Sequence, residues 1–446
     1  MAEITFLNHA SIFLSTGSES LLTDPWYSGS VFHEGWLLVQ ETPPDVVLSV
    51  LESTDFIWIS HEHPDHFSPA FFKRFGSIIR DKGIRVLFQE TIDGRVRDFL
   101  RSQDIPVMEM ENETWIDLSE TLRVKVVKSE FYDSALIAEV DGIRVFNLND
   151  CPMYDADDLK RFFKRHGACD ILLTQFSYAA WKGGPANRRW RCEAAAEKIA
   201  GVRRQAEMLE AKTVLPFASY AWFANELNFY LNDSVNTPRS LAELNPPLNA
   251  KVVVLRPLEN QALHCLEQDP ASLKFWEDAY DKLPKQAKLQ YANSVSIATL
   301  RAHFYEYRKR TLASNSEFLI RCISRMRLLG GFQPLVVHLV DHDRSVRLDV
   351  ARGVIDVSDE DPDVEMHSES LNLIFRSDFG FDTLTVNGCF AERKMGGFPR
   401  MTKCLALGNL NNLGIRLSWG LIFNPAILLM FMRRLRKVAG RLRPAD

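Results

Sequence analysis

The first half of this sequence predicts an α/β fold, and the second half predicts a smaller α+β domain. Short apolar runs typical of strands, such as residues 56–60 and 213–217, alternate with helical segments such as residues 68–83. Alternation of this kind is typical of α/β domains. The length of 446 residues exceeds one ordinary hydrophobic core and indicates more than one domain.

Composition limits the classes of partner and compartment. The formal charge of −5 provides no global field for nucleic acid, so we expect no nucleic-acid partner. The seven cysteines are scattered singly without a C-x-x-C pair, which argues against a disulfide framework. Reduced thiols in the cytoplasm are the simplest interpretation.

The order of predicted elements suggests three regions. Residues 4–7 and 11–15 are expected to form paired strands, and residues 251–257 the last strand of the first domain. We therefore place a catalytic domain at residues 1–257. Helical segments at 285–312 and 315–329, followed by strands, predict a C-terminal helical and α+β domain at residues 258–410. Residues 411–446 form an apolar and basic tail.

The clearest chemical signal is the H-x-H-x-D-H pattern of His61, His63, Asp65 and His66. It follows the apolar run FIWIS, and two prolines in HEHPDHFSP exclude a regular helix or central strand. Imidazole and carboxylate donors on such a loop suit zinc, iron or manganese. We expect His61 and His63 to face one ion, and Asp65 and His66 to face a second.

This motif, with DPWYSG upstream, resembles the metallo-β-lactamase superfamily, whose fold is an αββα sandwich with metals at one edge. More narrowly, the sequence resembles the CMP-N-acetylneuraminate hydroxylase family from about residue 4 to about residue 410. The resemblance is carried by DPWYSGSVFHEGWLL, FIWISHEHPDHFS, FNLNDCP, PFASY and VVVLRP, with a looser match at FGFDTLTVNGCF. It implies two metal ions, with iron favoured and zinc as the alternative.

The resemblance also implies roles for further residues. Asp150 corresponds to the carboxylate that bridges both ions, and with Asp65 it is our candidate for catalysis; an Asx turn is the alternative for Asp150. Asp24 is expected behind the ligands, in contact with them. His9 is placed with Asp24 in that outer layer, with a packed strand histidine as an equal alternative.

Two positions depart from the family pattern. Where the superfamily commonly has a third histidine this sequence reads KSEFYDS, so Glu130 is the nearest donor and Asp133 the next. A solvated Glu130 is the alternative. Where the hydroxylase family has a histidine after PFASY, this sequence has Asn225, a weaker donor. We include Asn225 among the candidate ligands, with an ordinary loop residue as the alternative.

The hydroxylase family also carries a Rieske-type iron-sulfur domain, whose ligands come in C-x-H and C-x-x-H pairs. Neither pair occurs in this sequence. An oxygenase activity would therefore need electrons from a separate reductase or ferredoxin.

The segment WKGGPANRRWR supplies candidate substrate contacts. Its Lys182, Arg188 and Arg189 suit the phosphate or carboxylate of a small-molecule or lipid-linked anionic substrate. A solvated helix N-terminus is the alternative. The apolar residues 417–432 and the basic residues after them resemble an interfacial anchor and suggest peripheral membrane contact. A core-packed or dimer-forming helix is the alternative for this tail.

Three functions follow from these observations. A di-iron oxygenase that hydroxylates its substrate with O2 is favoured by the length of the family resemblance. A dinuclear zinc hydrolase acting on an ester, amide or phosphodiester is the second. A non-catalytic lipid or partner binder with a degenerate site is the third, and its main support is Asn225.

Overall fold

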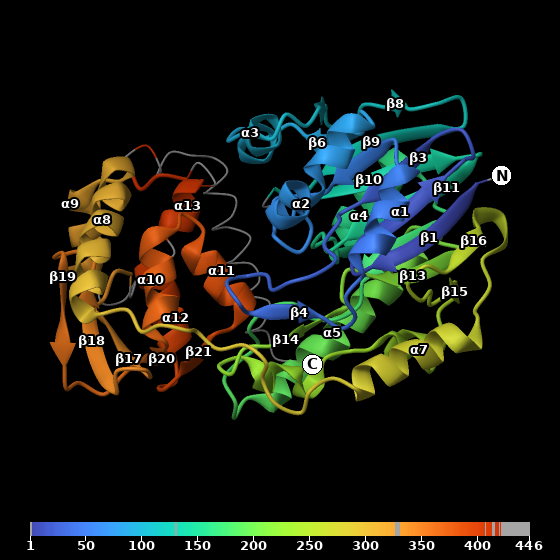
Figure 1. Ribbon diagram of the computed structural model, residues 1–446. Helices are drawn as coiled ribbons and strands as arrows, with labels where there is room; N and C mark the ends of the chain where they lie inside the picture. The colour runs from blue at the N-terminus through green and yellow to red at the C-terminus, as the bar shows by residue number, and fades with distance from the viewer. Residues whose placement is uncertain are drawn as a thin grey trace. The chain divides into compact units, whose positions relative to one another are not determined.

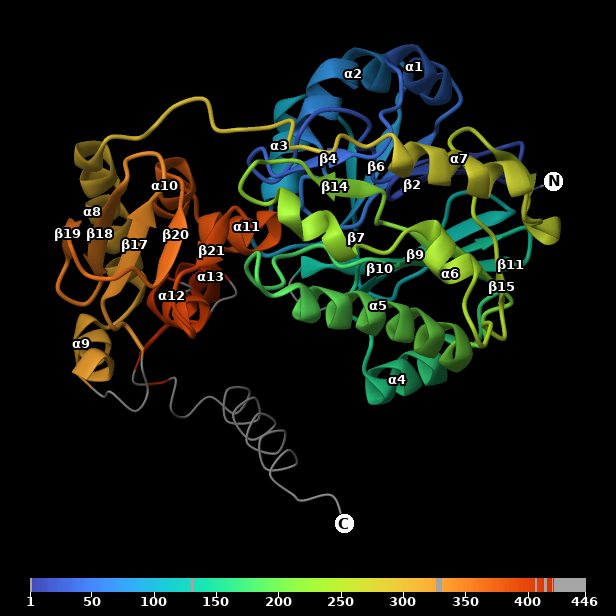
Figure 2. The same cartoon turned by 90° about the horizontal axis from the view of Figure 1, so that it is seen from below.

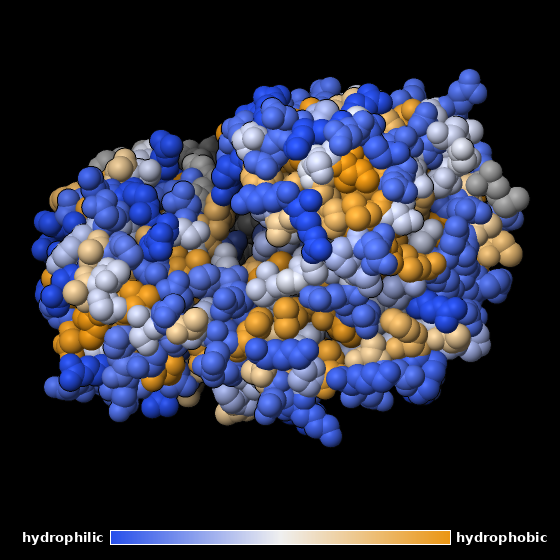
Figure 3. Space-filling view, viewed as in Figure 1, coloured by the Kyte–Doolittle hydropathy of each residue, from blue (hydrophilic) through white to orange (hydrophobic). Residues whose placement is uncertain are grey.

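The computed structural model describes residues 2–129, 132–325, 331–405, 407–412, 415–418 and 420. The chain forms two compact units, Met1–Gln290 and Tyr291–Asp446. The first unit contains two seven-stranded sheets, which Figure 1 shows side by side. On the face drawn in Figure 3, apolar side chains of this unit occur in separate groups among polar ones.

The first sheet has the strand order β16-β1-β2-β3-β5-β6-β7. Strands β1 and β2 are antiparallel, as are β2 and β3, whereas β3, β5, β6 and β7 are parallel. Its strands in chain order are β1 (Glu3–Asn8), β2 (Ser11–Ser15), β3 (Ser20–Thr23), β5 (Phe56–Ile59), β6 (Arg85–Gln89), β7 (Val107–Met110) and β16 (Asn260–Ala262).

The second sheet has the order β15-β13-β12-β11-β10-β9-β8. Strands β8 to β11 form an antiparallel meander, and β11, β12, β13 and β15 are parallel. Its strands are β8 (Ile116–Asp117), β9 (Leu122–Lys128), β10 (Ser134–Val140), β11 (Ile143–Asn149), β12 (Ile171–Gln175), β13 (Thr213–Phe217) and β15 (Lys251–Val252). A separate ribbon pairs β4 (Trp36–Leu38) with β14 (Ala221–Phe223).

Helices cover the outer faces of the two sheets. Figure 2 shows α1 (Pro44–Glu52) and α2 (Pro69–Asp81) on one side, and α4 (Ala156–His166) and α5 (Arg188–Met208) on the other. The remaining helices of this unit are α3 (Arg95–Ser102), η2 (Phe229–Ser234), α6 (Pro238–Ala242), η3 (Leu263–Cys265) and α7 (Pro270–Asp281). The predicted αββα sandwich is therefore confirmed.

The core explains why β5 is apolar throughout. Alternate side chains of a strand point to opposite faces of the sheet. Both faces are covered at β5, so all four of its residues are buried. Trp58 packs between the two sheets, whereas Ile57 and Ile59 pack with the residues beneath α1, α2 and α3. Directly afterwards, Ser68 caps α2 by accepting a hydrogen bond from the Phe71 amide. The loop 60–67 is thus held firmly at both ends.

The second unit is the smaller α+β domain. Its five-stranded sheet has the order β19-β18-β17-β20-β21, in which only the β17–β20 pair is parallel among the described strands. The strands are β17 (Leu335–Leu339), β18 (Arg344–Asp349), β19 (Val354–Ser358), β20 (Val364–Met366) and β21 (Phe390–Glu392). The helices are α8 (Ile297–Ser314), α9 (Glu317–Arg325), α10 (Ser368–Arg376), α11 (Gly380–Asn387), α12 (Gly397–Leu405) and α13 (Leu407–Asn412).

The first unit extends further than the predicted limit at residue 257, and the second begins at Tyr291 rather than 258. Strand β16 returns to pair with β1, and Trp276 on α7 is fully buried in the first core. The apolar and basic tail predicted at 411–446 falls almost entirely outside the described residues. None of the described helices combines the length and the apolarity that crossing a membrane requires.

Candidate metal centre

The candidate site lies at one edge of the first unit, where strands of both sheets end. Strands β1, β3 and β5 run in the same direction, so their carboxyl ends lie at the same edge. His9, Asp24 and His61 follow these three ends within two residues. The backbone of both His9 and Asp24 has a positive φ, 32° and 33°, which is uncommon outside glycine and is concentrated at functional sites.

The second sheet contributes two carboxylates to the same place. Asp133 immediately precedes β10, and Asp150 immediately follows β11. Because β10 and β11 are antiparallel, the start of one lies beside the end of the other. Asn149 anchors this corner: its side chain donates a hydrogen bond to the Ser134 carbonyl and accepts one from the Asp150 amide.

His61, His63 and Asp133 form a first group of donors. Nε2 of His61 lies 2.8 Å from Nδ1 of His63 and 3.7 Å from Oδ1 of Asp133. One donor atom from each residue lies within 4.8 Å of the other two. Two imidazoles and one carboxylate therefore converge on a point that one metal ion can occupy.

His9, Asp65 and His66 form a second group. Oδ2 of Asp65 lies 3.4 Å from Nε2 of His9 and 3.5 Å from Nε2 of His66. All three side chains are buried. This group again offers two imidazoles and one carboxylate.

Asp150 lies between the two groups. Its Oδ2 is 3.7 Å from Nε2 of His61 in the first group and 3.6 Å from Nε2 of His66 in the second. This is the position from which one carboxylate can contact two ions.

The donor atoms of the site fit bound cations. Buried polar atoms are normally hydrogen-bonded, because an unpaired one costs free energy. Several buried donors here have no hydrogen-bond partner within the described ranges: both ring nitrogens of His9, Oδ1 of Asp65, Nε2 of His66, Oδ1 of Asp133 and Oδ1 of Asp150. Metal ions at the two groups would satisfy Nε2 of His9, Nε2 of His66 and carboxylate oxygens that face the ions, which is most of these atoms.

The close approach of these buried, charged side chains raises the pKa of His66 and the pKa of Asp133. Burial alone would lower the pKa of His66, but Asp65, Asp150 and Asp24 outweigh it and raise that pKa to about 10. Burial, with the negative charge of Asp150, raises the pKa of the Asp133 carboxyl to about 9. In the metal-free protein, protons therefore occupy positions at which a cation is favoured.

Asp24 and Ser60 orient the histidines from behind. Oδ2 of Asp24 accepts hydrogen bonds from Ser60 Oγ at 2.7 Å and from His66 Nδ1 at 2.9 Å. Ser60 Oγ donates its own hydrogen bond to Asp24. It lies 2.9 Å from His61 Nδ1 and can accept a hydrogen bond from that nitrogen. Both imidazoles then direct Nε2 into the site, and this is the nitrogen that would bind a metal ion once any proton on it is displaced.

Two predictions about the ligands need revision. His9 was expected in the outer layer with Asp24, but the structure places it within the second donor group. No local motif marks it, since its role depends on β1 lying parallel to β5. Glu130 lies outside the described residues, and Asp133, the next donor named from the sequence, is present in the first group.

Asn225 is not available as a ligand, contrary to expectation. Its Nδ2 donates to the Glu34 carbonyl at 3.1 Å, and its Oδ1 accepts from the Leu227 amide at 3.1 Å. These contacts agree with the alternative for Asn225, an ordinary loop residue. A degenerate site loses its main support, because His9 supplies an imidazole to the second group.

The basic segment contributes to the fold more than expected. Arg189 is largely exposed and pairs with Glu193, while Arg188 lies 3.9 Å from Asp233. The fully buried Arg191 donates to both carboxylate oxygens of Asp233 and to carbonyls of residues 183–185. Arg188 and Arg189 thus already have acidic partners, and substrate binding by Lys182 stays a prediction.

Two sheets covered by helices, with clustered histidines and aspartates at one edge, define the class of protein. Residues 3–177 match the family described as beta-lactamase superfamily domain. The first unit therefore contains a domain of this superfamily, as the motif predicted.

Curated relatives include cytidine monophosphate-N-acetylneuraminic acid hydroxylases and one Homo sapiens protein named as an inactive form. Cytidine monophosphate-N-acetylneuraminic acid hydroxylase of Danio rerio is 26% identical over 258 residues, covering 54% of this chain and 42% of that protein. The Mus musculus hydroxylase is 24% identical over 399 residues, covering 82% of this chain and 66% of that protein. The chain thus spans less than two thirds of the length of these relatives.

Solved structures with similar folds include hydroxylases and hydrolases. CmlA, a diiron beta-hydroxylase from Streptomyces venezuelae, is 14% identical with a TM-score of 0.40, covering 58% of this chain and 54% of that one. A possible metal-dependent hydrolase from Veillonella parvula is 15% identical with a TM-score of 0.42, covering 59% and 99%.

Proposed function

We propose that the protein is a dinuclear metal-dependent oxygenase that hydroxylates its substrate with O2. The observation that carries this proposal is the composition of the two donor groups. Each consists of two histidines and one aspartate, His61, His63 and Asp133 in one and His9, His66 and Asp65 in the other. Two imidazoles and one carboxylate, with other coordination positions open, are typical of non-heme iron(II) oxygenases.

The absence of sulfur donors agrees with this choice of metal. Cys151 follows Asp150 directly, but burial raises the pKa of its thiol well above the usual value. A protonated, buried thiol is a poor metal ligand. The site is therefore built from nitrogen and oxygen donors, which iron accepts readily.

In this proposal the residues have distinct roles. Bound iron would supply the redox chemistry by which O2 is reduced. His61, His63 and Asp133 would hold one ion, His9, Asp65 and His66 would hold the other, and Asp150 is placed to contact both. Asp24 and Ser60 keep the imidazoles in the metal-binding tautomer. Electrons come from a donor outside these 446 residues, such as a reductase or ferredoxin.

The relatives support the same reaction class. Both named relatives are hydroxylases, and the Mus musculus match extends over 82% of this chain, well beyond the metal-binding unit. Their substrate is not assigned to this chain, because the shared length is limited and a fold hosts many reactions.

A dinuclear zinc hydrolase is the second candidate. It is favoured by the same histidine and aspartate donors, since zinc binds imidazole and carboxylate well. Two zinc ions would lower the pKa of a shared water toward about 7, and this water would attack an ester, amide or phosphodiester.

Metal analysis with optical spectroscopy separates the two candidates. The protein is purified without added metal from iron-supplemented cells, and its iron and zinc are counted per chain. The oxygenase should contain about two irons, with absorption that bleaches under dithionite and returns with air. Two zincs, with iron reconstitution giving no O2-dependent reoxidation, would reject the oxygenase and leave the hydrolase. An Asp150→Asn protein serves as the control, since loss of the bridge should weaken both ions.

A further inference from the structure

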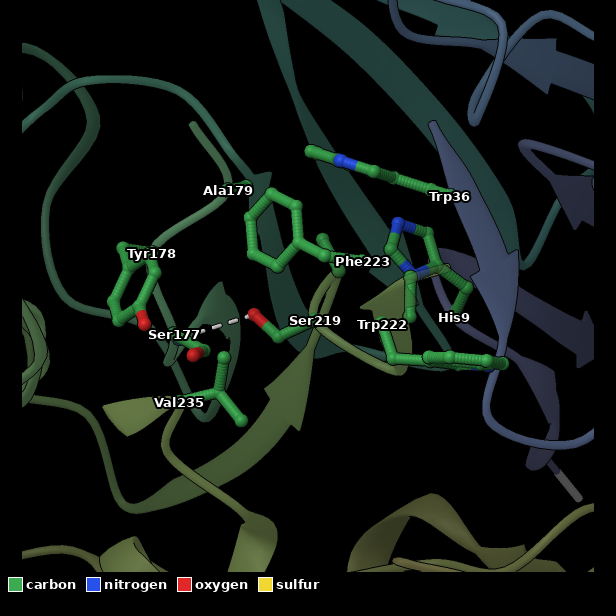
Figure 4. A pocket seen from close by; sticks show the side chains of 11 residues that line it. His9, Trp36, Ser177, Tyr178, Ala179, Ser219, Trp222, Phe223 and Val235 are labelled. Atoms are coloured by element: carbon green, nitrogen blue, oxygen red, sulfur yellow. Dashed lines mark hydrogen bonds between the residues drawn. The ribbon is translucent and has the colours of Figure 1, made fainter. Parts of the chain in front are cut away.

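A small pocket lies directly beside the candidate metal centre, with His9 as the wall between them. The pocket is lined by His9, Trp36, Ser177, Tyr178, Ala179, Ala218, Ser219, Ala221, Trp222, Phe223 and Val235. His9 faces Asp65 of the second donor group as well. Figure 4 shows its ring between the indoles of Trp36 and Trp222, with Phe223 alongside.

The walls of the pocket are predominantly apolar and held in place by the β4–β14 ribbon. Phe223 pairs with Trp36 in this ribbon, and their rings pack edge to face at 5.5 Å. Trp36, Trp222 and Phe223 are each less than 5% exposed. The aromatic lining is therefore fixed by backbone pairing as well as by packing.

The hydroxyl groups around the pocket are engaged elsewhere. Ser219 Oγ accepts hydrogen bonds from the amides of Phe176 and Ser177, and Ser177 Oγ accepts one from the Asn236 amide. The Tyr178 hydroxyl donates to the Leu231 carbonyl. These hydroxyl oxygens thus serve the surrounding backbone. The buried polar atoms of the lining that have no hydrogen-bond partner among the described residues are both ring nitrogens of His9, of which Nε2 faces Asp65, and Nε1 of Trp36.

The size of the pocket restricts its occupant. The pocket is partly open to solvent, and its free space of about 20 Å³ exceeds the minimum for one water and is far smaller than a sugar or a nucleotide. Small cavities with apolar linings tend to stay dry and to bind small apolar molecules such as xenon. Dioxygen has this size and this lack of polarity.

We propose that this pocket holds O2 next to the second metal position before the reaction. The inference rests on the proposed oxygenase function, since a hydrolase has no use for the gas. It assigns Trp36, Trp222 and Phe223 as the residues that concentrate O2 at the side of His9.

Dissolved O2 can be located directly because it is paramagnetic and broadens the NMR signals of nearby nuclei. The full chain is labelled with 5-fluorotryptophan and loaded with zinc, so that O2 binds without reacting. Signals are assigned with single Trp→Phe variants. Raising the O2 pressure should broaden Trp36 and Trp222 several-fold more than Trp58, which is equally buried but lies between the two sheets. Equal broadening of all three would overturn the proposal.

A pocket-filling variant provides the second test. Ala221 is half-buried on β14, where a β-branched side chain is tolerated, so Ala221→Ile should fill the space. It should abolish the excess broadening at Trp222 and raise the O2 concentration needed to reoxidise the reduced iron protein about tenfold. Thr213→Ile, also half-buried on a strand but remote from the pocket lining, is the matched control.

The two tests fail independently. Selective broadening without any O2-dependent reoxidation would reject the oxygenase and with it an O2 role for the pocket. Reoxidation by O2 with uniform broadening, or with an unchanged O2 dependence in Ala221→Ile, would reject the pocket and leave the oxygenase intact.

Discussion

Asp24 accepts a hydrogen bond from Nδ1 of His66 over 2.9 Å, in a position where neither side chain is exposed. An asparagine at position 24 would tolerate the positive φ but could present its amide to His66 and disturb the tautomer. We expect Asp24→Asn to lower metal affinity about 10- to 100-fold, as is typical when a residue behind a ligand is replaced. Competition with a chromophoric chelator measures this.

Asp55→Asn is the matched control for that experiment. Asp55 also accepts hydrogen bonds from the amide and hydroxyl of one serine, Ser20, but lies at the opposite end of β5. It should leave metal affinity unchanged. Equal losses in both variants would mean that Asp24 acts through general stability.

Replacement of His63 should empty the first metal position. His63→Ala removes one of three donors while its half-buried side chain contributes little to the core. Metal content should fall by about one ion per chain, with loss of activity and an unchanged circular dichroism spectrum. His264→Ala, an exposed histidine outside the donor groups, is the control. A His63→Ala protein that retained two ions per chain would contradict the assignment.

Replacement of Asn225 should affect stability and not metal. Asn225→Ala removes two side-chain hydrogen bonds and leaves the Glu34 carbonyl without this donor. The cost should be about 1–3 kcal/mol, measured as the free energy of unfolding in urea. Metal content should stay at the value of the unaltered protein, and a selective loss of one ion would restore Asn225 as a ligand.

The metal-free protein should lose stability as the pH rises from 7 to 8. Its folded state binds protons that the unfolded chain releases, because the pKa of Asp133 rises from 3.8 to about 9 and that of His66 from 6.5 to about 10. Raised folded-state pKa values give stability that falls with increasing pH, here by about 2 kcal/mol. Urea unfolding of chelator-treated protein at both pH values measures it. Metal-loaded protein should not show this loss, since the ions replace both protons.

Local patterns were sufficient to predict the metal-binding loop. The run FIWIS and the two prolines around His61 and His66 determine a strand followed by an irregular loop, and the structure has both. Asp133 was named as a donor because it is close in sequence to the place where the superfamily has a histidine. These inferences needed no knowledge of which strands pair.

The remaining part of the site depends on long-range pairing. His9 reaches Asp65 because β1 and β5 run parallel in one sheet with two strands between them, and no local pattern specifies this. The contacts of Asn225 could not be predicted for the same reason, since its partner Glu34 is 191 residues away in the sequence. The boundary at 257 missed β16 for the same reason: three residues are too few to be recognised without their partner strand.

The pairing of β16 with β1 has a consequence for how the protein can be divided. A fragment ending at residue 257 would lack β16 and leave β1 as an open edge strand, with unpaired backbone groups along its outer side. His9 stands one residue beyond the end of that strand. Ending the first unit at residue 257 and not at Gln290 would therefore loosen a candidate metal ligand near the start of the chain, so the smallest fragment able to hold both ions should extend to Gln290.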